Sequence, residues 1–92
     1  MQGVALYFEV PFGAEEAKRK TAGAARNHCP GAAAQVEGSA LVVRFPDTAS
    51  DDKIFYFCSQ LNDVDHPVIK CDLFGCSDYA RQKIQGFFGV AS

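Results

Sequence analysis

The chain has 92 residues, of which 48% are hydrophobic and 22% are charged, and its formal net charge is −2. This length predicts one domain spanning residues 1–92 and excludes the large enzyme barrels, which need roughly 250 residues. The apolar fraction is too high for a disordered chain, and no apolar run approaches the ~20 residues of a membrane span. The N-terminus lacks the features of a secretion signal, so we expect a cytoplasmic protein that makes no contact with membranes.

The first predicted element is a strand over residues 4–10, VALYFEV. Apolar side chains at every second position, from Val4 to Val10, indicate a strand with one buried face. Tyr7 falls on the opposite face. We expect the strand to be broken by the Pro-Phe-Gly sequence at residues 11–13.

The next predicted element is a helix over residues 14–28, AEEAKRKTAGAARNH. Glu15 and Glu16 would lie in its first turn and Arg26 near its end, an order of charges that suits the helix dipole. One face of this helix carries only small side chains, which would let it lie close to a sheet. These side chains are Ala14, Ala17, Thr21, Ala24 and Ala25.

Residues 32–46 predict a hairpin of two short strands around the turn Glu37-Gly38-Ser39. Glycine followed by serine between two strand-like runs is typical of a tight turn. In the second strand the alternate apolar residues from Leu41 to Phe45 would face the core, and Arg44 would point the other way.

Residues 51–62, DDKIFYFCSQLN, predict a second helix. Ser50 or Asp47 can cap it, and Asp51 and Asp52 favour the positive end of its dipole. Helical spacing indicates that the core face of this helix consists of Ile54, Phe57, Cys58 and Leu61.

A last strand and a last helix complete the chain. In the strand, residues 68–74, we expect Ile69, Cys71 and Leu73 to face the core and Lys70 to point away. Ser77 would cap the helix over residues 77–88, with Phe87 or Phe88 on its inner face.

This order of elements, β-α-β-β-α-β followed by one helix, predicts an α+β protein with the ferredoxin-like split β-α-β fold. Short connections then imply a four-stranded antiparallel sheet with two helices on one face. The open face would carry Tyr7, Arg44 and Lys70, with Tyr7 close to Arg44 if the first and third strands are neighbours. The sequence leaves undecided whether the extra C-terminal helix covers that face.

The cysteines predict neither a cofactor nor a metal site. They lie at irregular spacings, so free buried thiols are the simplest interpretation, although a disulfide between Cys71 and Cys76 stays open for an oxidising compartment. A zinc site could be drawn from these two cysteines with His28 and Cys29, but structural zinc sites usually have tighter paired spacing. The loop residues Asp63, Asp65 and His66 could bind a cation, yet such residues are also good loop formers.

We expect a small non-enzymatic protein-binding domain of the inhibitor, immunity, phage-encoded antagonist or regulatory type. It would act through the open sheet face, a sheet edge or the C-terminal segment, because large exposed apolar patches usually mark interaction sites. Its partner would be another protein or a second copy of itself, giving a homodimer. The residues predicted to bind the partner are Tyr7, Arg44, Asp51, Asp52, Lys70, Phe87 and Phe88.

Two alternatives stay open. One is a dimeric small-molecule sensor or enzyme with a pocket between open sheet faces, lined by Tyr7 and Arg44. The other is an RNA-binding domain, which would display aromatic side chains on the central strands. Only Tyr7 meets that requirement, the basic-glycine-aromatic motif is missing, and the basic residues form no stripe, so we do not expect nucleic acid as the partner.

Overall fold

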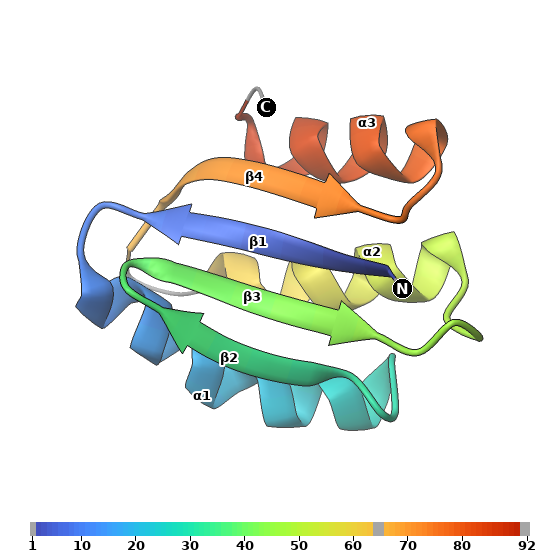
Figure 1. The fold of residues 1–92 in the computed structure, drawn as a ribbon, viewed down its shortest axis with the longest axis horizontal. Helices are drawn as coiled ribbons and strands as arrows, with labels where there is room; N and C mark the ends of the chain where they lie inside the picture. Colours follow the sequence, from blue (N-terminus) through green and yellow to red (C-terminus); the bar gives the residue numbers. More distant parts are fainter. Residues whose placement is uncertain (1, 64–65, 91–92) are drawn as a thin grey trace.

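The computed structural model describes residues 2–63 and 66–90, and in this part of the chain a four-stranded antiparallel sheet carries three α-helices (Figure 1). The strand order is β2-β3-β1-β4, so β1 and β3 are central and β2 and β4 form the edges. The elements are β1 (Gln2–Phe8), α1 (Pro11–Asn27), β2 (Ala33–Glu37), β3 (Ala40–Phe45), α2 (Asp51–Gln60), a 3-10 helix (Leu61–Asp63), β4 (Val68–Phe74) and α3 (Asp78–Phe88). The α+β class and the order of elements along the chain are therefore as predicted.

β1 joins the two halves of the sheet, because it pairs antiparallel with β3 on one side and with β4 on the other. Its boundaries differ from the predicted ones. The strand already begins at Gln2, whose Nε2 donates to the carbonyls of Pro46 at 3.3 Å and Ala49 at 3.2 Å. It ends at Phe8, and Val10, predicted to face the core, is instead 41% exposed at the N-cap of α1.

The strand ends before Pro11, but α1 begins at Pro11 and not at Ala14, so the predicted start of the helix is wrong. Proline suits the first helical position, because its φ is already helical and its missing N–H would have had no partner there. Glu15 and Glu16 consequently lie beyond the first turn. The predicted face of small residues is confirmed, with Ala25 packed partly against the core and the rest buried: Ala14, Ala17, Thr21 and Ala24.

The hairpin and α2 agree with the prediction, except that Glu37, predicted in the turn, is the last residue of β2. β2 and β3 are joined by Gly38 and Ser39, and the positive φ of Gly38, 65°, fits the first position of a tight hairpin turn. Ser50 caps α2 by accepting a hydrogen bond from the Lys53 N–H at 3.3 Å. The helix ends at Gln60, and the 3-10 turn completes the predicted segment.

β4 has the predicted bounds, but one of its side chains points away from the predicted side. Tyr7 pairs with Lys70, and the register then shifts so that Phe8 pairs with Val68. This irregularity packs Val68 partly against the core and leaves Ile69 53% exposed, whereas the alternation predicted Ile69 to be buried. A bulge changes which side chains face the core, and it depends on the neighbouring strand.

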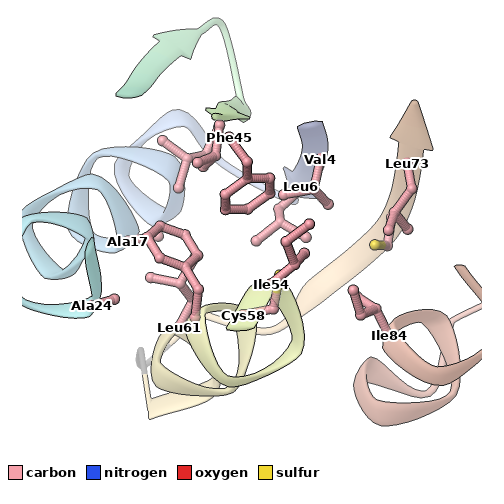
Figure 2. Packing of buried hydrophobic residues seen from close by; sticks show 14 of the residues in the cluster. Val4, Leu6, Ala17, Ala24, Phe45, Ile54, Cys58, Leu61, Leu73 and Ile84 are labelled. Carbon is pink, nitrogen blue, oxygen red and sulfur yellow. The ribbon is translucent and has the colours of Figure 1, made fainter. Parts of the chain in front are cut away.

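α3 extends the layer formed by α1 and α2 and does not cover the open sheet face (Figure 1). It lies beside β4, and Ile84, fully buried, lies between β4 and α2 (Figure 2). Ser77 caps it as predicted, accepting from the Ala80 N–H at 3.1 Å. Of the two adjacent phenylalanines, Phe88 packs partly against the core and Phe87 is 38% exposed.

The core lies between the sheet and the helix layer, where side chains from all three helices meet those of the strands (Figure 2). Burying one large apolar side chain contributes roughly 1.5–3 kcal/mol. The four residues predicted for the core face of α2 and its 3-10 extension are all completely buried. The largest fully buried side chains are Val4, Leu6, Phe8, Leu41, Val43, Ile54, Phe57, Leu61 and Ile84.

The lengths and compositions of the helices bear on whether any of them could cross a membrane. Within residues 2–63 and 66–90, none of them combines the length and the apolar composition that crossing a bilayer requires.

Replacing glycine with alanine is expected to have opposite effects on stability at Gly3 and at Gly23. A Cβ on Gly3 would collide with the Phe74 ring and lie 2.6 Å from the Val43 carbonyl oxygen, whereas a Cβ on Gly23 in α1 meets nothing within 4 Å. We expect Gly3→Ala to lower the free energy of unfolding by about 1–3 kcal/mol, because the backbone of β3 must move. Gly23→Ala should raise it by up to about 1 kcal/mol through helix propensity. Urea unfolding of both variants tests this, and a stable Gly3→Ala protein would contradict it.

Candidate functional site

The open sheet face is flat at its centre and charged towards its edges. Small side chains of β1 and β3 occupy the middle, and Ala5 and Ala40 are only 8% and 7% exposed because their neighbours cover them. The Phe74 ring lies over Gly3 at one end of β1. From β2 to β4, the three rows across the face are Ala33-Arg44-Gly3-Phe74, Gln35-Val42-Ala5-Asp72 and Glu37-Ala40-Tyr7-Lys70.

These rows bring Tyr7 to Lys70 but not to Arg44. Lys70 Nζ lies 5.3 Å from the centre of the Tyr7 ring and 3.5 Å from a carboxylate oxygen of Asp72. Arg44 pairs with Gly3, four residues along β1 from Tyr7, which is about 13 Å at the usual rise of a strand. The expected closeness of Tyr7 and Arg44 is therefore wrong, although β1 and β3 are neighbours.

The predicted acidic pair at the start of α2 is occupied by contacts with α3. Asp51 Oδ2 accepts a hydrogen bond from the Ser77 hydroxyl at 2.9 Å, and Ser77 itself caps α3. Asp52 Oδ1 lies 3.7 Å from Lys83 Nζ. Both carboxylates thus hold the two helices together, which gives them a structural role independent of any partner.

Phe87, by contrast, belongs to a continuous run of rings on the outer side of the helix layer. Phe55 of α2 packs against Phe87 of α3 with ring centres 5.4 Å apart and planes at 80°. Tyr56 contacts Phe55 at 5.8 Å on one side and His28, after α1, at 5.8 Å on the other. Phe88 contacts Phe87 at 5.4 Å and connects the run to the core.

A lysine extends this run to a further ring. Lys83 Nζ lies 4.5 Å from the centre of the Phe55 ring and 5.7 Å from that of Tyr79. A cation over an aromatic ring contributes roughly 0.5–1 kcal/mol at an exposed site. We call these residues the aromatic surface, and they are His28, Phe55, Tyr56, Tyr79, Lys83 and Phe87.

Much of the aromatic surface is open to solvent. Tyr79 is 63% exposed, Tyr56 52% and Phe87 38%. Phe55 packs edge-to-face against both Tyr56 and Phe87, and such contacts restrict the rings before a partner binds. Of its members, only Phe87 was among the residues predicted to bind a partner.

The sequence does contain a signal for the missed residues. In the run IFYF, Phe55 and Tyr56 fall outside the helical stripe of Ile54, Phe57, Cys58 and Leu61, so two large rings had to lie outside the core. What the sequence does not show is that α3 packs beside α2 and aligns Tyr79, Lys83 and Phe87 with those rings.

A groove of about 300 Å³ lies on the helix side, where α1 passes the end of α2. Neither Tyr7 nor Arg44 lines it, so it is not the sheet-face pocket of the sensor hypothesis. Its lining is polar and basic, comprising Arg19, Lys20, Gly23, Ala24, Asn27 and Gln60.

The cysteines are free thiols, and within the described residues no three His, Cys, Asp or Glu side chains gather in a way that could hold a metal ion. Asp65 of the predicted cation loop lies outside the described residues, and His66 Nε2 lies 4.0 Å from a Glu16 oxygen. Burial raises the pKa of the Cys71 thiol to about 12, with the Asp72 carboxylate adding to the effect. Burial likewise raises the pKa of Cys58 well above its ordinary value.

Comparison of the chain with protein families, with curated proteins and with solved structures found no match in any of the three. The geometry of its surfaces is therefore what bears on function.

The raised pKa of Cys71 predicts a loss of stability in alkaline solution. In the unfolded chain the thiol ionises from about pH 8.5, whereas in the folded protein it keeps its proton up to about 12. The unfolded state is therefore favoured as pH rises through this range, by at most about 1.4 kcal/mol per pH unit for this thiol. Urea unfolding at several pH values should show a steeper decline for the parent protein than for Cys71→Ala. Equal slopes would contradict the prediction.

Proposed function

We propose that this chain is a small non-enzymatic protein-binding domain that docks its partner on the aromatic surface of α2 and α3. The observation that carries the proposal is the row of ordered rings there, with Tyr56, Tyr79 and Phe87 each more than a third exposed. Tyrosine and other aromatic residues are enriched at the centres of protein interfaces, where they bury large areas at a small entropic cost.

The charges around the aromatic surface support the same role. Asp52 lies beside the rings, with Oδ1 3.7 Å from Lys83 Nζ, so charged groups adjoin the apolar rings. That division, with an apolar centre and a polar rim, is the usual anatomy of a protein interface. The open sheet face also has charges towards its edges, but its centre consists of small side chains and offers one ring, Tyr7, where the aromatic surface offers several.

Two finer expectations join this proposal. The order β-α-β-β-α-β and the central position of β1 and β3 support the ferredoxin-like arrangement, with α3 as an addition to the helix layer. Three of the four cysteines are free thiols buried in the core, a state that a reducing compartment maintains, which supports a cytoplasmic location.

Loss of two exposed rings should weaken partner binding without unfolding the domain. We expect Tyr56→Ala combined with Phe87→Ala to weaken binding by tenfold or more, since truncating an aromatic anchor at the centre of an interface typically removes over 1 kcal/mol. The tagged protein is used to isolate the partner from an extract of the cells that produce this chain. Calorimetry with the purified partner then measures the affinity of each variant.

The matched control is Tyr7→Ala combined with Lys70→Ala, which removes the aromatic and cationic pair of the sheet face. Thermal unfolding verifies that both double variants fold. If the sheet-face variant loses the partner and the helix-face variant keeps it, the binding surface is the open sheet face and the proposal is wrong.

A further inference from the structure

The two edges of the sheet differ in how they are protected. At β4, α3 lies alongside the strand, and Gln85 Nε2 donates to the Cys71 carbonyl at 3.1 Å. The register shift near Val68 also interrupts the regular pairing of this strand. Natural proteins protect edge strands with such covers and bulges, because unpaired edge groups would otherwise recruit another strand. β2, the other edge, has no strand beyond it in the part of the chain that the structure describes, and it contains neither proline nor lysine.

The pairing within the hairpin shows which backbone groups of β2 point towards β3 and which point away from the sheet. The Ser39 carbonyl accepts from the Phe8 N–H at 2.9 Å, so residue 39 directs its backbone towards β1 and Ala40 directs its own towards β2. Glu37 is paired with Ala40, and alternate residues of a strand direct their backbone groups to opposite sides. The N–H and C=O groups of Ala34 and Val36 therefore point away from the sheet.

We propose that β2 pairs antiparallel with β2 of a second copy of this chain, joining two four-stranded sheets into one of eight strands. The two-fold axis passes between the two Gln35 residues, so that Ala34 of each copy pairs with Val36 of the other. This register places four backbone hydrogen bonds between the copies, from the groups that point outwards. It also keeps the faces aligned, because Ala34 and Val36 pack against the core in each copy.

The charges of the open face select this register. Within the described residues Glu37 and Arg44 take part in no ion pair, and they lie in different rows, opposite Ala40 and Ala33 respectively. In the proposed dimer Glu37 lies opposite Ala33 of the second copy, with Arg44 of that copy next in the same row. Two strand spacings separate them, about 10 Å, and the small alanine between leaves the arginine side chain free to reach the carboxylate.

This interface and the aromatic surface lie in different parts of the molecule. β2 is at one edge of the sheet, whereas α3 lies beyond the other edge (Figure 1). Each copy in the dimer would therefore keep its aromatic surface open. Dimerisation and partner binding can each fail without the other.

Reversing the two charges tests the register directly. Glu37→Arg brings two arginines together at each of the two symmetric contacts, and Arg44→Glu brings two glutamates together. We expect either substitution to weaken the dimer by about tenfold or more, because each of the two contacts across the alanine changes from an attraction between opposite charges to a repulsion between like charges. When one chain carries Glu37→Arg and the other Arg44→Glu, both contacts again join an arginine to a glutamate. An equimolar mixture of the two variants should therefore form heterodimers. The double variant Glu37→Arg, Arg44→Glu should dimerise like the parent.

Sedimentation equilibrium measures the dissociation constants, and native mass spectrometry identifies the heterodimer from the masses of the two chains. Lys70→Glu is the matched control, since it makes the same charge change as Arg44→Glu on the same face but at the β4 edge. A parent protein that stays monomeric up to millimolar concentration overturns the proposal. So does a dimer whose affinity is unaffected by the single reversals, or single variants that do not combine when mixed.

Discussion

Burial of one face of the sheet under a layer of three helices is the constraint on which the rest of the structure depends (Figure 1). The strands contribute alternate residues to the core, because only one face is covered, and β4 departs from this alternation at its register shift beside Val68. α1 lies against the sheet on a face of alanines, and α2 supplies the larger side chains, among them Ile54 and Phe57, both completely buried. α3 completes the layer over β4 through Ile84.

This arrangement divides the remaining large side chains between two outer surfaces of different character. The outer side of the sheet is flat, because Gly3 leaves room for the Phe74 ring and alanines fill the middle. The outer side of the helix layer is where the aromatic rings gather, since α2 carries more large apolar residues than its core face can hold. Asp51 and Asp52 connect α2 to α3 through Ser77 and Lys83, beside the place where the rings of the two helices meet.

Local patterns predicted the parts of this fold that local chemistry decides. The serines at residues 50 and 77 were identified as caps because capping involves only a side chain and the N–H groups of the next turn. The buried residues of β3 and α2 were identified because burial of one face imposes a period of two on a strand and about 3.6 on a helix. The start of α1 was placed too late because proline, which breaks a helix from within, favours its first position.

Features that depend on distant segments could not be predicted in the same way. Ile69 is exposed because of the register between β4 and β1, and the separation of Tyr7 from Arg44 follows from the register between β1 and β3. Among the candidate functional residues, Phe87 was identified from its position near the end of the chain. Tyr79 and Lys83 were missed, because their significance comes from the packing of α3 beside α2.

The position of α3 has a consequence for the motions of the protein. Its main contacts are with α2 and β4, so it can separate as a unit while the four strands stay paired. Such a partial opening would release the Cys71 carbonyl from Gln85 and uncover the edge of β4 together with the inner side of Ile84. Amide hydrogens of α3 would then exchange with solvent through a lower free-energy barrier than those of β1, and the open form, with a bare strand edge, would be the species most prone to aggregate.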